Sequence, residues 1–377
     1  RPIIIKVLKC IQRFALLKDI HDFVDFNSVF PLFFELIYNS PDFEVVDAVF
    51  DVLENIIDHF DMKYITPLIE PSIALLAHAV QRYGTSPGQD SLNFDDKCRS
   101  LLYAIIENVK LVILPYHEVI YPLLANFFEP SSLVFLCEYN SLFSEDFPTL
   151  FNETTEKVLN MLNDYLNSQS YDQDDHEDIV FYTCAGFNIL SKKDSFGSYA
   201  LQTSALMIEV INRDNKAKMM AFGVLATLAS SFDTIMAPLF PTLLEIVSKM
   251  PFQLLIENAK DIEDKYETDV NQIIMNCLII VQSCYIAASQ AENVIQLVFH
   301  VFGIVQSFAE RDLQVVSAAI DLLYFLEQPL LLALDESGLL SEFINEYAKI
   351  DSLVPFINEI KNKIGCTNEE EEIPDLE

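Results

Sequence analysis

Carboxylates are the side chains with chemical potential that recur at regular spacing in this chain. Four of them, Asp47, Asp51, Glu54 and Asp58, stand at i, i+4, i+7 and i+11. This spacing places all four on one face of a helix, opposite the apolar residues of the same segment. Two interpretations stay open. The acids form either a solvated face or a surface that binds Lys and Arg side chains through charge-assisted hydrogen bonds.

A second acidic cluster lies in the expected connection 168–178. Its members are Asp172, Asp174, Asp175, Glu177 and Asp178. A calcium-binding loop of the helix–loop–helix type requires a glycine at its sixth position and a glutamate at its twelfth, and this segment lacks that order. We therefore expect no metal here. The segment is either an acidic loop that contacts a basic partner or a solvated loop without a ligand.

Other catalytic signatures are missing from the sequence. None of the patterns GxGxxG, GxxxxGK[ST], GxSxG or HExxH occurs, so we expect no enzyme and no cofactor. An enzyme with an unfamiliar site is the third-ranked interpretation. The seven cysteines are spread singly without a CxxC pair, which predicts reduced, buried thiols in an intracellular protein. Cys277, Cys284 and His300 lie in apolar stretches and are expected in the core.

The charge balance restricts the class of partner. The chain has 23 Lys and Arg against 57 Asp and Glu, a net charge of -34. Such a protein repels phosphate backbones and anionic lipids, so we expect no direct nucleic-acid or membrane partner. The uninterrupted apolar runs are also much shorter than a membrane span. Basic protein segments are the expected partners, unless the acids serve only to keep an apolar-rich chain soluble.

The elements that position these residues are predicted to be helices, because apolar residues recur at helical spacing nearly throughout the chain. The protein is therefore predicted to be all-α. Three similar segments begin at Asp42, Asp214 and Asp312, each expected to cap a helix. Their separations correspond to about four and two units of a repeat of about 40 to 50 residues, the range of HEAT repeats. Each repeat is a helical hairpin that must stack on its neighbours to bury its apolar face.

About eight hairpins are expected. Their two helices are predicted at 27–39 with 43–60, 63–82 with 94–112, 114–128 with 130–145, 147–168 with 178–192, 195–211 with 214–232, 235–259 with 267–288, 291–307 with 312–327, and an irregular pair within 338–365. A proline followed by leucine is expected near the start of the first helix of a pair, because the missing N–H of a proline has no partner in the first turn of a helix. These prolines are Pro31, Pro67, Pro122, Pro238 and Pro329.

We therefore predict a right-handed superhelical HEAT solenoid, an α-α superhelix, with one wide concave surface. Residues 1–365 are expected to form a single array and residues 366–377 an acidic disordered tail. The protein is expected to be a monomer. Longer connections are expected at 84–95, 168–178 and 254–268. Ile3–Leu17 is interpreted as the second helix of a truncated repeat, which suggests a piece of a longer solenoid.

Two stretches resemble the C-terminal half of the importin-β, or karyopherin-β, family of nuclear transport receptors. Asp214–Met250 (DNKAKMMAFGVLATLASSFDTIMAPLFPTLLEIVSKM) is similar to a family repeat with a small-residue helix followed by a proline-marked helix. Asp264–Ser289 (DKYETDVNQIIMNCLIIVQSCYIAAS) is similar to a long connection and the helix after it, and Asp146–Asn167 is a looser match. The chain has no Trp, and no individual contact residue of the family is matched.

The resemblance implies an armadillo-like helical receptor that shuttles between cytoplasm and nucleus through the nuclear envelope. Such receptors wrap cargo, or the basic segment of an adaptor such as importin-α, on the inner surface and release it when the Ran GTPase bound to GTP engages the N-terminal half. In that family the second helix of each hairpin lines the inner surface. The acidic helix face with Asp47, Asp51, Glu54 and Asp58 would then lie inside. Nucleoporin phenylalanine-glycine repeats would bind between outer helices. The alternative is a HEAT scaffold of a phosphatase or chromosome-associated complex.

Overall fold

The computed structural model describes residues 2–15, 26–39, 43–83, 98, 100–106, 108, 110–126, 130–167, 173–213, 217–252, 255, 269–288, 292–307, 312–337 and 339–365. Over these ranges the chain forms helices joined by short turns, and no strand occurs in them. The expected all-α class is confirmed. The expected disordered tail, 366–377, and the expected connections 84–95 and 254–268 lie outside the described residues or almost entirely so.

The chain divides into two compact units, Arg1–Lys157 and Val158–Glu377. The division lies within one helix, α8 (Pro148–Asn167). Each unit is built of antiparallel helical pairs stacked side by side, which is the HEAT-type arrangement that the sequence predicts. The prediction of one continuous array over 1–365 stays a proposal.

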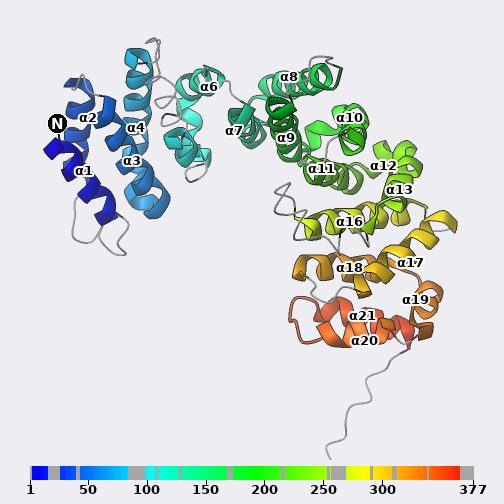
Figure 1. The fold of residues 1–377 in the computed structure, drawn as a ribbon. Coiled ribbons are helices and arrows are strands. Elements are labelled where there is room, and N and C mark those ends of the chain that lie inside the picture. Colours follow the sequence, from blue (N-terminus) through cyan, green and yellow to red (C-terminus); the bar gives the residue numbers. More distant parts are fainter. Residues whose placement is uncertain are drawn as a thin grey trace, which may run out of the picture. The chain divides into compact units, whose positions relative to one another are not determined.

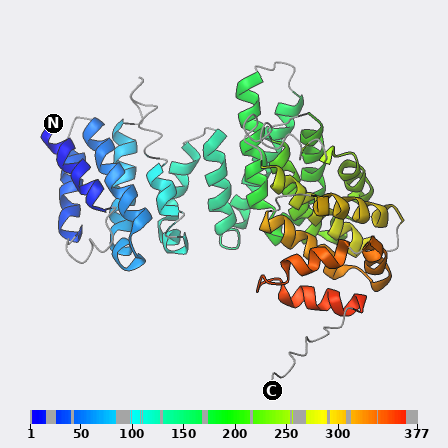
Figure 2. The same ribbon diagram turned by 60° about the horizontal axis from the view of Figure 1, so that its bottom comes forward.

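The first unit contains seven further described elements before α8 and one short helical stretch at 100–106. They are α1 (Pro2–Ala15), α2 (Phe26–Asn39), α3 (Phe43–His59), α4 (Met62–Tyr83), the 3-10 helix η2 (Lys110–Tyr116), α6 (His117–Asn126) and α7 (Pro130–Leu142). Figure 2 shows these helices, blue to cyan, beside one another. Helix α3 packs against α1, α2 and α4, and a continuous apolar core runs from Leu8 to Phe143.

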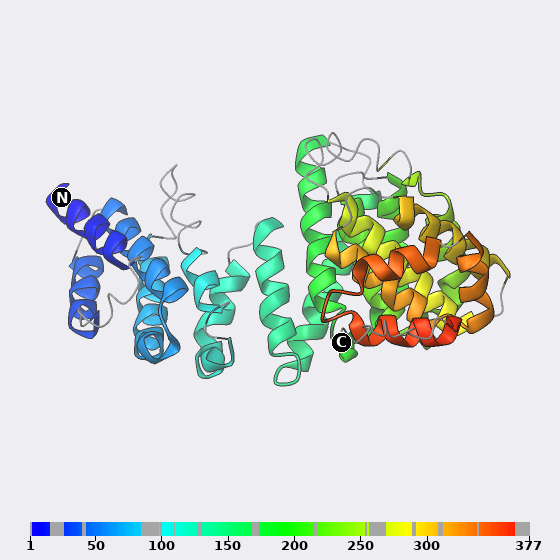
Figure 3. The ribbon, with the colours of Figure 1, turned by 90° about the horizontal axis from the view of Figure 1, so that it is seen from below.

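The second unit follows the same plan. Its elements after α8 are α9 (Gln173–Leu190), η3 (Asp194–Tyr199), α10 (Ala200–Arg213), α11 (Lys218–Ser231), α12 (Asp233–Met236), η4 (Ala237–Leu239), α13 (Phe240–Ser248), α16 (Val270–Ala288), α17 (Glu292–Ser307), α18 (Leu313–Phe325), α19 (Gln328–Leu334), η5 (Asp335–Ser337), α20 (Leu339–Tyr347) and α21 (Val354–Ile364). Helices α20 and α21, orange to red, close its C-terminal end and lie nearest the viewer in Figure 3.

The second helices of successive pairs form one continuous layer in this unit. Helix α9 packs on α11, α11 on α16, α16 on α18 and α18 on α21, and Figure 1 shows them in this order from top to bottom. We call these five helices the second-helix layer. Small side chains permit the close packing of its helices, because Ala221, Ala226 and Ala229 of α11 and Ala319 of α18 are buried.

Helix α16 is at the centre of this layer. By length and composition the window Val270–Ala287 is apolar enough to cross a membrane, although no uninterrupted apolar run suggested this. Yet 61% of the window is buried within the protein, and α11, α13, α17 and α18 all pack against it. Its apolar character is therefore explained by its position as a core helix covered on several sides.

Four of the five prolines lie near the start of their helices but beyond the first turn, so the missing first-turn N–H does not explain them. Pro31, Pro67 and Pro122 are each the sixth residue of α2, α4 and α6. Pro238 is the sixth residue counted from Asp233, within the 3-10 turn that interrupts α12 and α13. All four are exposed, so the carbonyl that loses its helical partner lies on a hydrated side. Only Pro329, at the start of α19, lies in the first turn of its α-helix.

The predicted capping aspartates have different outcomes. Asp312 caps α18, because its Oδ1 accepts a hydrogen bond of 2.7 Å from the backbone N–H of Gln314. At the equivalent place before α11, the cap position is Ala217, which provides no side-chain acceptor. The helix begins at Lys218, later than predicted, and Asp214 lies outside the described residues, as does Asp42. Asp269, which was not predicted as a cap, caps α16, because its Oδ1 accepts a hydrogen bond of 2.8 Å from the backbone N–H of Asn271.

Loss of the Asp312 cap is expected to destabilise the protein measurably. Asp312→Ala removes the acceptor for a helix N–H and should lower the free energy of unfolding by about 1 kcal/mol. Asp312→Asn, which keeps a side-chain acceptor, should leave stability nearly unchanged and is the matched control. Urea unfolding followed by circular dichroism measures both. Equal stability of the Ala and Asn variants would contradict the capping role.

Candidate functional site

The four acids predicted as a stripe lie together on α3. Asp47, Asp51 and Glu54 are half-buried and Asp58 is exposed. The opposite face of α3 is fully buried through residues such as Val49, Leu53 and Ile56. The sequence thus places these carboxylates correctly on one helix face, which we call the acidic stripe. Its partial burial means that the carboxylates are less hydrated than freely exposed ones.

The acidic stripe borders the next helical pair. Asn108 donates a hydrogen bond of 2.9 Å from Nδ2 to Asp58 Oδ1, and a second one of 3.0 Å to the carbonyl of Ala104. Asn55, next to Glu54, donates from Nδ2 to the carbonyl of Asp51 at 2.7 Å. Amide and carboxylate groups therefore share this side of α3. The stripe's role in partner binding remains a prediction.

The second predicted acidic cluster is not a loop where the structure describes it. Helix α9 begins at Gln173, so Asp174, Asp175, Glu177 and Asp178 belong to its first turns. Asp172 lies outside the described residues. Carboxylates are favourable at a helix N-terminus because they offset the positive end of the helix dipole. This preference explains why α9 begins upstream of the expected start at 178.

A polar pocket of about 510 Å³ lies across three helices of the second-helix layer. We call it the amide pocket, because its wall contains Asn188 of α9 and Gln272 and Asn276 of α16. The other residues that line it are Lys192, Met219, Met220, Gly223, Ala226, Thr227, Ser230, Asp269, Met275 and Ile279. None of these positions was singled out from the sequence as a site.

The amide of Asn276 is incompletely hydrogen bonded. Its Oδ1 accepts a bond of 3.2 Å from Gln272 Nε2, whereas its Nδ2 has no partner. The side chain is only 4% exposed. A buried donor without an acceptor costs about 1–3 kcal/mol, so native proteins rarely retain one without a reason.

Gly223 of α11 lies between the two asparagines. A Cβ placed on it would be 3.5 Å from Asn276 Nδ2 and 3.6 Å from Asn188 Oδ1, ordinary van der Waals distances. Alanine would therefore fit here, and in a helix interior glycine is less stable than alanine by about 0.5–1 kcal/mol. Packing alone does not explain the glycine. Two signals were visible in the sequence: the glycine inside a helical pattern and the recurrence of asparagine on second helices.

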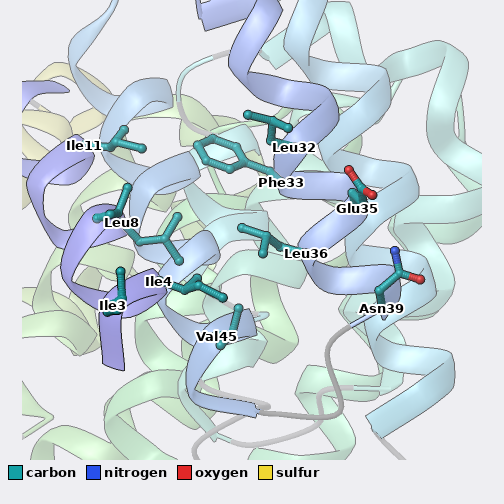
Figure 4. A pocket seen from close by; sticks show the side chains of 11 residues that line it. Ile3, Ile4, Leu8, Ile11, Leu32, Phe33, Glu35, Leu36, Asn39 and Val45 are labelled. Atoms are coloured by element: carbon teal, nitrogen blue, oxygen red, sulfur yellow. The ribbon is translucent and has the colours of Figure 1, made fainter. Parts of the chain in front are cut away.

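A second cavity of about 580 Å³ is an open apolar groove between α1 and α2 in the first unit. Figure 4 shows Ile4, Leu8 and Ile11 of α1 opposite Phe33 and Leu36 of α2. Its outer rim is exposed, with Ile3 77% and Leu32 55% accessible. The lining favours an apolar ligand surface, because all of its described residues except Glu35 and Asn39 are apolar.

His300 is exposed, so its predicted place in the core is wrong. Val294, Val298 and Val301 form the buried face of α17, and the histidine points away from it because of the helical period. It lines a cavity of about 520 Å³ together with Glu245 and Ser248 of α13. A hydrogen bond from Lys249 lowers the pKa of Glu245, which is therefore a weak base.

The remaining reactive groups are structural. Burial raises the pKa of the thiols of Cys137 and Cys277, and that of Cys284 to about 12, so these thiols are protonated at neutral pH. Nucleophilic attack requires the thiolate. Cys277 and Cys284 are buried as predicted, whereas Cys10 is exposed, contrary to prediction. Within the described ranges no group of three or more His, Cys, Asp or Glu side chains is arranged to hold a metal ion.

Comparisons with known proteins give a similarity in structure. No protein-family profile matches the chain, and no curated protein sequence matches it. Among solved structures, the crystal structure of importin beta in an ammonium sulfate condition is similar over 95% of this chain and 59% of that chain, with 11% identity and a TM-score of 0.43. This chain thus spans less than two thirds of that protein.

Thiol reactivity tests the burial of the cysteines. Under native conditions iodoacetamide should modify Cys10 rapidly and leave Cys98, Cys137, Cys184, Cys277 and Cys284 unmodified, because these five are buried. In urea all of them should react. Peptide mapping by mass spectrometry measures the modification of each site. Cys366 lies outside the described residues and is not part of the comparison. Native labelling of Cys277 as fast as that of Cys10 would refute the packing of α16.

Proposed function

We propose that this protein is a HEAT-repeat receptor that binds basic protein segments through its acidic stripe and works in nucleocytoplasmic transport. The observation on which this rests is the set of four carboxylates on one face of α3 in a protein of net charge -34. Half-buried carboxylates interact more strongly with a cation than fully hydrated ones do. A Lys- or Arg-rich segment supplies several cations that can form charge-assisted hydrogen bonds with these carboxylates.

Internal ion pairing supports the same ligand class. Several basic side chains are engaged within the fold: Arg213 pairs with Glu209 and donates from Nη1 to the carbonyl of Leu166 at 2.7 Å. Lys363 donates to the carbonyl of Tyr324 at 2.5 Å. Because the acids outnumber the bases 57 to 23, internal pairing leaves a large negative excess. This excess attracts basic partners and accelerates their association.

The transport form of the proposal comes from the sequence resemblance of 214–250 and 264–289 to importin-β repeats. It adds an importin-α-like adaptor or basic cargo as the ligand, Ran bound to GTP as the release factor and nucleoporin repeats as further partners. It also implies shuttling between cytoplasm and nucleus. A HEAT scaffold that assembles a phosphatase or chromosome-associated complex is the alternative, and it would bind none of these.

Calorimetry at two salt concentrations tests the proposal directly. The titrant is the basic importin-β-binding segment of an importin-α. Tight binding that weakens with salt is the expected result, because surface charge attraction is screened over about 10 Å at 0.1 M salt. Absence of binding at low salt would reject the adaptor-receptor function and favour the scaffold alternative.

Charge reversal tests the acidic stripe as the binding surface. Changing Asp47, Asp51, Glu54 and Asp58 together to Lys should weaken binding of the basic segment at least tenfold and flatten its salt dependence, since attraction becomes repulsion. Because three of these residues are half-buried, the set with Asn at the aspartates and Gln at Glu54 provides a gentler variant. It should bind with intermediate affinity.

A control of equal charge change separates the stripe from net charge. Reversal of Glu153, Glu156 and Asp164 on α8 and Glu359 on α21, all exposed, should reduce affinity only slightly. Circular dichroism confirms that each variant is folded. If the control set and the stripe set weaken binding equally, the ligand responds to total charge and the stripe assignment is wrong.

A further inference from the structure

We propose that the amide pocket binds the main chain of an extended peptide segment, with Asn188 and Asn276 as the hydrogen-bonding residues and Gly223 as the point of closest approach. The inference deepens the proposed function, because it names a second mode of contact to a protein ligand. This mode depends on hydrogen bonds and is independent of ligand charge.

The unpartnered amide indicates what the ligand must offer. Asn276 Nδ2 is a donor, is buried, lines the pocket and has no acceptor. Asn188 Oδ1, an acceptor, lies on the other side of Gly223. A peptide unit has one carbonyl acceptor and one N–H donor. An extended main chain therefore offers a partner to both asparagines, to the first through a C=O and to the second through an N–H.

The glycine sets how near the ligand can come. With hydrogen in place of a methyl group, Gly223 leaves the pocket wall next to the two asparagine side chains without a Cβ. A Cβ at this position would stand in the space that the peptide unit needs, although it would meet the neighbouring protein atoms only at ordinary contact distances. Gly223 is thus dispensable for packing and required for the ligand.

The rest of the lining favours a peptide over an anion. Among the described residues that line the pocket, Lys192 is the sole basic one, and Asp269 lies in the same wall. Phosphate groups would meet too little positive charge in a strongly acidic protein. Met219, Met220 and Met275 supply flexible apolar surface for the side chains of a ligand, as methionine-rich surfaces do for varied peptide sequences.

The test uses an uncharged probe so that the acidic stripe plays no part. The probe is the blocked peptide acetyl-Ser-Leu-Ser-Leu-Ser-Leu-Ser-amide, titrated at millimolar concentration into the full chain labelled with 13C at the methionine methyl groups. The methyl signals of Met219 and Met275 should shift on titration, whereas that of Met62 on α4 should not. The same peptide with N-methylated backbone, which lacks the N–H donors, should produce no shift.

Two variants and one matched control localise the binding. Gly223→Ala should weaken binding about tenfold or more while leaving the fold intact and raising the thermal unfolding midpoint. Asn276→Ala should weaken it about fivefold, the effect of one neutral hydrogen bond. Gly303→Ala on α17 makes the same change in another helix where nothing lies within 4 Å, so it should leave binding unchanged.

The outcomes discriminate clearly. Absence of methyl shifts in the wild-type protein, or equal shifts in Gly223→Ala and wild type, would overturn the inference. The stripe variants should bind this neutral probe like wild type. If the wild-type protein binds the neutral probe but not the basic segment, the result counts against the proposed function alone. If it binds the basic segment but not the neutral probe, the result counts against the amide pocket alone.

Discussion

The packing of α16 against α11 on one side and α18 on the other is the interaction on which the second unit depends. A helical pair has too little apolar surface to fold by itself, so each pair is stable only when a neighbouring pair covers it. Alanines on α11 and α18 bring the helices close enough for continuous burial. The same closeness brings Asn188, Gly223 and Asn276 of three different helices to one place.

Hydrogen bonding divides the asparagines of the second helices into two kinds. Asn140 of α7 is buried and satisfied, because its Nδ2 donates to the carbonyl of Leu136 and to Thr154 Oγ1 at 2.9 and 3.0 Å. Such an amide fixes the packing of its helix pair. Asn276 is equally buried, but its Nδ2 has no partner. The difference between a structural and a binding role thus lies in the neighbouring residues and not in the residue type.

Much of the fold follows from local periodicity. The range 43–60 was predicted for a helix that runs Phe43–His59, because acidic and apolar residues alternate there at helical spacing. The same reasoning located the acidic stripe. It failed for His300, where an apolar stretch says nothing about which side of the helix is covered, and it missed α19 as a separate short helix.

The amide pocket could not be predicted because its residues are far apart in sequence and meet only through the stacking of pairs. Nothing near Gly223 in the chain shows that Asn188 and Asn276 flank it. The prolines are a similar case: their recurrence was visible, but their depth within α2, α4 and α6 depends on where the preceding turn ends.

The packing also has a consequence for how the chain acquires its structure. The main partners of α11 are α9, α10, α12 and α16, and those of α18 are α16, α17 and α21, all close neighbours along the chain. Contacts between nearby segments close short loops and form quickly. This pattern allows each pair to dock on its predecessor as soon as it leaves the ribosome, so folding can start during synthesis, before the C-terminal helices are made.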